Sequence, residues 1–97
     1  MIVNRRTFPI KRPRMQEAVD LLRVHVKPFF HPHTLRIYTP NIAPFDILVV
    51  EIEFESLAEY DKLWTDWWTR PETVELLPKW HDVTAGGGTN EIWTLEE

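Results

Sequence analysis

The sequence contains no cysteine, only three glycines and no long apolar run. Without cysteine the chain can form neither a disulfide scaffold nor a thiolate nucleophile nor a thiolate-bound metal. No apolar segment approaches the ~20 residues that a membrane-spanning helix needs. Asn4, Arg5 and Arg6 also interrupt the segment where a signal peptide would have its apolar core. We therefore expect a cytoplasmic protein with no membrane partner.

The three glycines are consecutive, from Gly86 to Gly88. They match neither the GxGxxG nor the Walker spacing of phosphate-binding loops, and they lead into a strand pattern instead of a helix. The segment is therefore predicted to be a hinge or loop, and we expect no cofactor.

An excess of positive charge is also missing, because 11 lysines and arginines against 15 acidic residues give a net charge of −4. Nucleic acid is not an expected partner, since phosphate binding needs a concentrated cationic face. The basic residues do cluster early, at Arg5, Arg6, Lys11, Arg12 and Arg14. We interpret this cluster as a solvated strand end and helix start; the alternative is a site for an anionic ligand.

The sequence does contain a clear change of period between Phe45 and Trp68. Over residues 46–55 the even positions from 48 to 54 are apolar and the odd positions from 51 to 55 are glutamates, which predicts a strand with one apolar face. Ser56 and Glu59 then form a capping box at a helix start. The predicted buried stripe of that helix consists of Leu57, Tyr60, Leu63, Trp64, Trp67 and Trp68.

Weaker patterns predict the remaining elements. These are a strand over Ile2–Ile10, a helix from Pro13 that Lys27 and Pro28 end, a strand over Leu35–Thr39, a short helix from Pro71 to Pro78 and a strand over Glu91–Leu95. The strands over 35–39 and 46–55 should form a hairpin. The order β-α-β-β-α-β predicts one ferredoxin-like α+β domain over 1–97, with a four-stranded antiparallel sheet and helices on one face.

Such a sheet leaves one face without helices, and the strand over 46–55 would place Ile47, Val49, Glu51 and Glu53 there. Packing against a second copy would bury the aliphatic groups, while Arg36 or Arg6 supply counter-charges. We therefore expect a twofold homodimer, in which the glutamates form ion pairs instead of acting as acid-base catalysts. The alternative is a monomer with a half-solvated sheet.

Two segments carry a family resemblance. Arg6, Thr7 and Phe8, followed by Lys11 and Pro13, resemble the strand-to-helix opening of NIPSNAP-type proteins. The segment 53–60 with its downstream tryptophans is similar to the strand-helix junction of that family and of the dimeric α/β-barrel superfamily. The resemblance covers nearly the whole chain and departs at Arg14, where the family has a glycine.

The resemblance implies a homodimer whose sheets meet face to face, with a pocket between sheet and helices in each protomer. Members of the superfamily include cofactor-free oxygenases, haem-degrading enzymes, isomerases and proteins without known activity, so the fold alone does not select a function.

The histidines are the first candidates for chemistry. His31 and His33 are two residues apart, and His25 or His81 would have to complete a metal site. The pattern matches no recognised spacing, so we interpret these residues as solvent-side histidines and expect no metal.

Five tryptophans in 97 residues are the second candidates. We assign Trp64 and Trp67 to the core, whereas Trp68, Trp80 and Trp93 could line a cavity. Arg36 and Tyr38 would supply its polar ends. The alternative is that the aromatic side chains fill the core completely.

These residues support three functional hypotheses. The first is a dimer that binds a small, partly aromatic or acyl-type molecule through Arg6, Arg36, Tyr38, Trp68, His81 and Trp93. The second is a cofactor-independent oxygenase or isomerase of the antibiotic-biosynthesis-monooxygenase type, in which an arginine stabilises an enolate-like anion and His81 or Tyr38 moves a proton. Haem degradation would need His81 as axial ligand. The third is a structural dimer without ligand.

Overall fold

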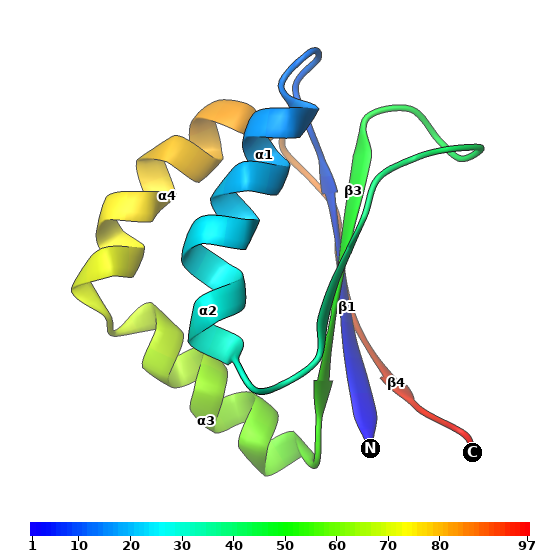
Figure 1. Ribbon diagram of the computed structural model, residues 1–97, viewed down its shortest axis with the longest axis vertical. Helices are drawn as coiled ribbons and strands as arrows, with labels where there is room; N and C mark the ends of the chain where they lie inside the picture. Colours follow the sequence, from blue (N-terminus) through cyan, green and yellow to red (C-terminus); the bar gives the residue numbers. More distant parts are fainter.

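The computed structural model describes residues 1–97 as two layers, a four-stranded sheet and a layer of helices on one of its faces (Figure 1). The elements are β1 (Ile2–Pro9), α1 (Met15–Leu21), the π-helical turn η1 (Leu22–Val26), α2 (Lys27–Phe30), β2 (Leu35–Tyr38), β3 (Ile47–Phe54), α3 (Leu57–Trp68), α4 (Pro71–Val83) and β4 (Thr89–Thr94). The antiparallel strand order β2-β3-β1-β4 is that of a ferredoxin-like α+β fold, which confirms the predicted fold class.

Strand β3 shows the predicted alternation. Its even positions, Leu48, Val50, Ile52 and Phe54, are buried beneath the helices, whereas its odd positions are half-buried on the opposite face. The predicted hairpin with β2 is also present, and its register places Leu35 opposite Ile52 and Tyr38 opposite Val49. We call the face of the sheet that the helices cover the inner face and the opposite one the outer face.

Helix α3 starts where the capping pattern predicts. The backbone N–H of Glu59 donates to Oγ of Ser56 over 3.2 Å. The return bond differs from a standard capping box, because Oε1 of Glu59 accepts from the backbone N–H of Glu55 over 2.8 Å and not from that of Ser56. The side chain therefore fixes the end of β3 as well as the start of the helix.

The stripe of α3 is buried only in its middle. Trp67 is in the core, and Tyr60, Leu63 and Trp64 pack against it. Leu57 and Trp68, at the two ends of the helix, are 59% and 52% exposed, so their predicted burial is wrong. The angular position of a residue on a helix is correct from the period, but its burial also depends on whether a neighbouring element extends that far.

Both proline boundaries are wrong. Pro28 does not end the first helix, because η1 separates it from α1 and it occupies the first turn of α2, where a missing N–H is tolerated. Pro78 lies inside α4, which continues to Val83. The carbonyl freed by Pro78 belongs to Val74, an exposed residue, so it can bind water. Phe29 and Phe30, which follow the predicted end of the first helix, are consequently helical.

Strand β4 is the exposed edge of the sheet. It begins two residues earlier than predicted, directly after Gly88, whose φ of +112° is accessible mainly to glycine. A Cβ at this position would collide with the backbone oxygen of Thr7. Gly88 therefore lets the chain approach β1 closely enough to pair.

The core lies between the inner face of the sheet and α1, η1, α2, α3 and α4. Phe30 and Phe54 are its largest fully buried side chains, and their rings are 6.1 Å apart in an edge arrangement. None of the helices combines the length and the apolar content needed to cross a bilayer.

Candidate functional site

The sheet divides the six predicted ligand-binding residues among three places. Arg6 and Trp68 line a cavity between the inner face and the helices. Arg36, Tyr38 and Trp93 belong to the outer face, because they pair with Glu51, Val49 and Val3. His81 is exposed on α4. One protomer therefore does not bring these residues into a single site.

The cavity has a volume of about 100 Å³ and opens beside Trp68. It is lined by Arg6, Phe8, Leu22, Val26, Val50, Ile52, Trp64, Trp67, Trp68, Leu76, Leu77 and Trp80. Arg6 is the only member of this set that is not hydrophobic. A mostly apolar cavity with one charged group has the composition of small-molecule sites.

The alternation of β1 explains why Arg6 faces the cavity. Asn4 pairs with Ile52 and Arg6 pairs with Val50, and both β3 partners are buried on the inner face. Paired residues on neighbouring strands point to the same side, so Asn4 and Arg6 point inward while Arg5 points outward. The register of β1 against β3, which the structure shows, is what places these two residues on the inner face.

Arg6 is held in place by two neighbours. Its guanidinium carbon lies 3.7 Å from the centre of the Trp64 ring, and its Nε donates to Oδ1 of Asn4 over 3.2 Å. Burial lowers the pKa of Arg6, and the nearby Tyr60 hydroxyl opposes this shift. No carboxylate pairs with Arg6.

Asn4, which sequence reasoning did not select, is completely buried and organises this end of the cavity. Its Nδ2 donates to Oδ1 of Asn90 over 2.6 Å and to the carbonyl of Glu91 over 3.0 Å. Its Oδ1 accepts from Arg6 and from Nε1 of Trp64, the latter over 3.1 Å. All four hydrogen-bonding positions of the amide are therefore used, which fixes both the guanidinium and the indole beneath it.

The aromatic walls come from β1, α3 and α4. The Phe8 and Trp80 rings meet edge to face at 5.0 Å. Of the three tryptophans predicted to line a cavity, Trp68 and Trp80 do so and Trp93 does not. Trp64 and Trp67, which we assigned to the core, line the cavity as well.

The outer face carries the four residues predicted for it, Ile47, Val49, Glu51 and Glu53, all half-buried. Glu53 pairs with Arg36 over 2.8 Å. Glu51 pairs with Arg5 over 2.9 Å and accepts from the Tyr38 hydroxyl over 3.0 Å. The pKa of Tyr38 is raised, first by burial and then by its bond to Glu51.

The prediction that Arg6 could supply a counter-charge on the outer face is wrong. Arg5 does so, because successive residues of a strand alternate between faces and Arg6 lies inside. The expectation that Arg36 pairs with a glutamate there is correct.

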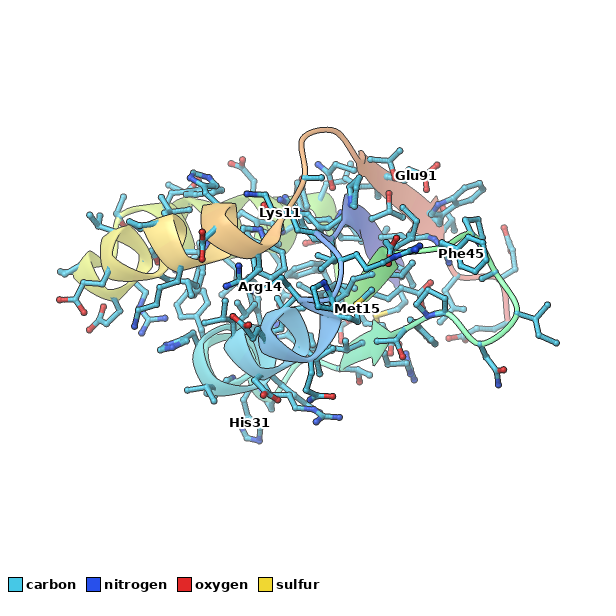
Figure 2. All side chains as sticks on the ribbon, turned by 90° about the horizontal axis from the view of Figure 1, so that it is seen from above. Lys11, Arg14, Met15, His31, Phe45 and Glu91 are labelled. Carbon is cyan, nitrogen blue, oxygen red and sulfur yellow. The ribbon has the colours of Figure 1, made fainter.

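A loop between β2 and β3 projects beyond the outer face. Ile42 is 99% and Phe45 84% exposed in this loop. Figure 2 shows Phe45 on the side of the sheet away from the helices. Together with Tyr38 and Trp93, these side chains make the outer face unusually apolar for a surface open to water.

The two histidines of the metal hypothesis have separate surroundings. His33 lies between the carbonyl of Phe30, 2.9 Å from Nδ1, and Glu59, 3.0 Å from Nε2. His31 projects into solvent (Figure 2). The structure contains no group of three or more histidine, aspartate or glutamate side chains that could hold a metal ion.

The early basic residues do not form one surface. Arg12 pairs with Asp46 over 2.8 Å, and Arg14, at the start of α1 (Figure 2), pairs with Glu17 over 2.6 Å and Asp82 over 2.9 Å. Hydrogen bonds from Arg14 lower the pKa of both of its acidic partners. Arg6 alone of the cluster remains for an anionic ligand inside the fold.

The fold defines an α+β protein of the ferredoxin-like class with an apolar cavity between its two layers. No protein-family model and no curated protein match the sequence. A NIPSNAP family protein from Agrobacterium tumefaciens superposes with a TM-score of 0.85 at 17% identity, over 99% of this chain and 93% of that one. An uncharacterized NIPSNAP domain protein from Burkholderia xenovorans gives 0.84 at 12% identity, over 99% and 95%.

A structure of an antibiotic biosynthesis monooxygenase is also similar, with a TM-score of 0.73 at 16% identity over 100% of both chains. At these identities the shared property is the fold. The chain thus has the fold of NIPSNAP family proteins, as the resemblance predicted, and shares it less closely with the monooxygenase.

Proposed function

We propose that this protein is a cytoplasmic, NIPSNAP-like homodimer that binds a small, partly apolar molecule in the cavity of each protomer. The observation that carries the proposal is an apolar cavity whose single charged lining residue, Arg6, is fixed by the fully hydrogen-bonded Asn4. A preorganised polar group among apolar walls orients a ligand at low entropic cost.

Tryptophan fluorescence tests ligand binding directly, because four tryptophans line the cavity. Titration with a panel of phenolic and acyl compounds should shift or quench the emission and saturate. Leu77→Phe, which fills the cavity, should abolish the response, while Val74→Phe on the exposed side of the same helix should preserve it. A panel without any saturable response in the wild type would contradict the proposal and favour a dimer without ligand.

The outer face supports the homodimer. The glutamates that β3 places there, Glu51 and Glu53, are already neutralised within the protomer by Arg5 and Arg36, so two copies can meet over β3 without burying unpaired charge. Trp93, which is 57% exposed, and the loop residues Ile42 and Phe45 supply apolar surface that a second copy would cover.

Sedimentation velocity tests this assembly. The wild type should sediment as a dimer at micromolar concentration, and Val49→Asp should dissociate it because an unpaired carboxylate would be buried at the contact. Val24→Asp, on an exposed helical position, is the matched control and should remain dimeric. A wild type that sediments only as an 11.6 kDa species would contradict the dimer.

The oxygenase or isomerase alternative is supported by the fold shared with a monooxygenase and by Arg6, which could stabilise an enolate-like anion. However, neither His81 nor Tyr38 lies in the cavity. Tyr60 does not line the cavity either, but it acts on Arg6 and its hydroxyl accepts from Asn90 over 3.4 Å, so it is the better candidate to move a proton. Oxygen uptake with a bound phenol that is lost in Tyr60→Phe would support this activity.

A further inference from the structure

We infer that the cavity selects a small monocyclic carboxylate, whose oxygens pair with the terminal nitrogens of Arg6 and whose ring lies among the tryptophans. The inference rests on the proposed function, since it names the class of ligand for the same cavity.

The charge of Arg6 is the first reason for this assignment. Five of the seven arginines pair with a carboxylate of the protein, namely Arg5, Arg12, Arg14, Arg36 and Arg70. Of the two others, Arg23 is exposed and its charge is stabilised by water, whereas Arg6 is half-buried in an apolar lining. A partly desolvated cation without a carboxylate partner is less stable than a paired one, so an anionic ligand would gain the charge interaction that the protein does not supply.

The geometry of the guanidinium is the second reason. Asn4 occupies Nε, and Trp64 supports one face of the guanidinium plane. Neither terminal nitrogen has a carboxylate partner in the protein, and the Tyr60 hydroxyl is the other polar group that acts on the guanidinium. Two parallel N–H donors match the two oxygens of a carboxylate, and this bidentate pairing is stronger and more directional than a single bond to a neutral acceptor.

The size and lining of the cavity are the third reason. Its volume of about 100 Å³ is below that of the roughly 150 Å³ engineered cavity that holds one benzene molecule. The cavity therefore has room for no more than one ring, with the polar group of the ligand extending toward Arg6. The edges and faces of Phe8, Trp67 and Trp80 suit an aromatic ring, which pairs with them edge to face or offset.

Benzoate and benzamide test the inference, because they share the ring and differ in charge. Calorimetric titration of the wild type should give an affinity for benzoate about 10- to 100-fold higher than for benzamide, the range expected of charged against neutral hydrogen bonds. Arg6→Met should remove this preference and leave benzamide binding in place. Arg6→Lys keeps the charge but not the two parallel N–H donors, so it should retain only part of the preference for benzoate. Arg23→Met should show the same preference as the wild type.

The outcomes separate the inference from the proposed function. Equal affinities in the wild type, or a preference that survives Arg6→Met, would overturn the carboxylate assignment and leave an apolar binding cavity. No binding of either compound, nor of any compound of the wider panel, would overturn both. If Arg6→Met does not fold, the affinities of the wild-type protein for benzoate and benzamide still test the carboxylate assignment.

Discussion

The inner and outer faces of the sheet are built from the same strands, but one has an unpaired charge and the other has exposed apolar side chains. On the inner face every large apolar side chain of β3 is buried, and the group without a partner is the charge of Arg6. On the outer face the glutamates of β3 are paired with arginines, and the exposed large side chains are apolar, notably Trp93 and Phe45.

This difference indicates the kind of molecule that each face can bind. A small anion would pair with Arg6 on the inner face and would need no apolar contacts beyond the cavity. A flat apolar partner would cover the apolar side chains of the outer face without adding charges. A second copy of the same face could be such a partner, because in a twofold dimer the same surface meets itself. The comparison therefore supports the proposed ligand site and the proposed dimer contact on opposite faces of the sheet.

Substituting the adjacent residues Asn4 and Arg5 is the strongest test of this division. Asn4→Ala should lower the free energy of unfolding by about 2–5 kcal/mol, because Nε of Arg6 and Nε1 of Trp64 lose their buried acceptor. Arg5→Ala removes a partly exposed ion pair and should change it by about 1 kcal/mol or less. Urea denaturation measures both values; similar losses would show that the two faces do not differ in this way.

All residues of strand β4 are exposed, so burial does not distinguish its two faces. Its attachment to the sheet depends on the close contact between Gly88 and the backbone of Thr7. Gly88→Ala should destabilise the protein by about 2–4 kcal/mol, through the positive φ and the collision with Thr7. Gly86→Ala, where a Cβ would meet nothing within 4 Å, is the matched control and should be neutral. Thermal unfolding compares them, and a neutral Gly88→Ala would mean that β4 pairs in another way.

The two valines of β3 compare the faces with one residue type. Val50→Ala should lower the stability by about 2 kcal/mol at every protein concentration, because it opens a hole in the core. Val49→Ala should have a smaller effect that diminishes as the protein is diluted, since it acts on the proposed dimer contact and both proteins become monomers at low concentration. Chemical denaturation at several protein concentrations measures this. Concentration-independent losses at both positions would assign Val49 a role within the protomer only.

The fold could be predicted because its strongest signals are local. The alternation of β3 and the cap at Ser56 fix a strand and a helix start without knowledge of the rest of the chain. The helix ends near Pro28 and Pro78 could not be predicted, because they depend on the π-helical turn before one proline and the solvent exposure around the other. Burial of Leu57 and Trp68 likewise depends on how far neighbouring elements extend.

The site was predicted only in part for a related reason. Of the six predicted ligand-binding residues, Arg6 and Trp68 line the cavity, because the assignment of all six to one pocket ignored the face on which each lies. Trp93 and Tyr38 are separated from Arg6 by the sheet. Asn4 has no distinctive motif, and its role follows from pairing with β4 across 86 positions in the sequence. Strand register, and not composition, decides which of these groups meet.

The loss of stability at low pH should come mainly from carboxylates of the helical layer. This is the smallest of the expected differences between the two sides of the sheet. Hydrogen bonds from Arg14 lower the pKa of Glu17 and of Asp82, and the bond to Asp82 links α4 to the start of α1. The backbone N–H of Glu55, followed by His33, lowers that of Glu59. Carboxylates with lowered pKa stabilise the fold above their ordinary pKa values, 3.8 for Asp and 4.5 for Glu, and lose this contribution as the pH falls through the lower folded values.

The melting temperature should therefore be constant near neutral pH and fall below about pH 4. Asp82→Asn should lower it at pH 7 but not at a pH below the folded pKa of Asp82, where the wild-type carboxyl is also protonated. Glu53→Gln, which removes the pair with Arg36 on the outer face, is the control for a charge lost from the sheet. If the difference between Asp82→Asn and the wild type persisted unchanged into acid, the Arg14 link would act through packing and not through charge.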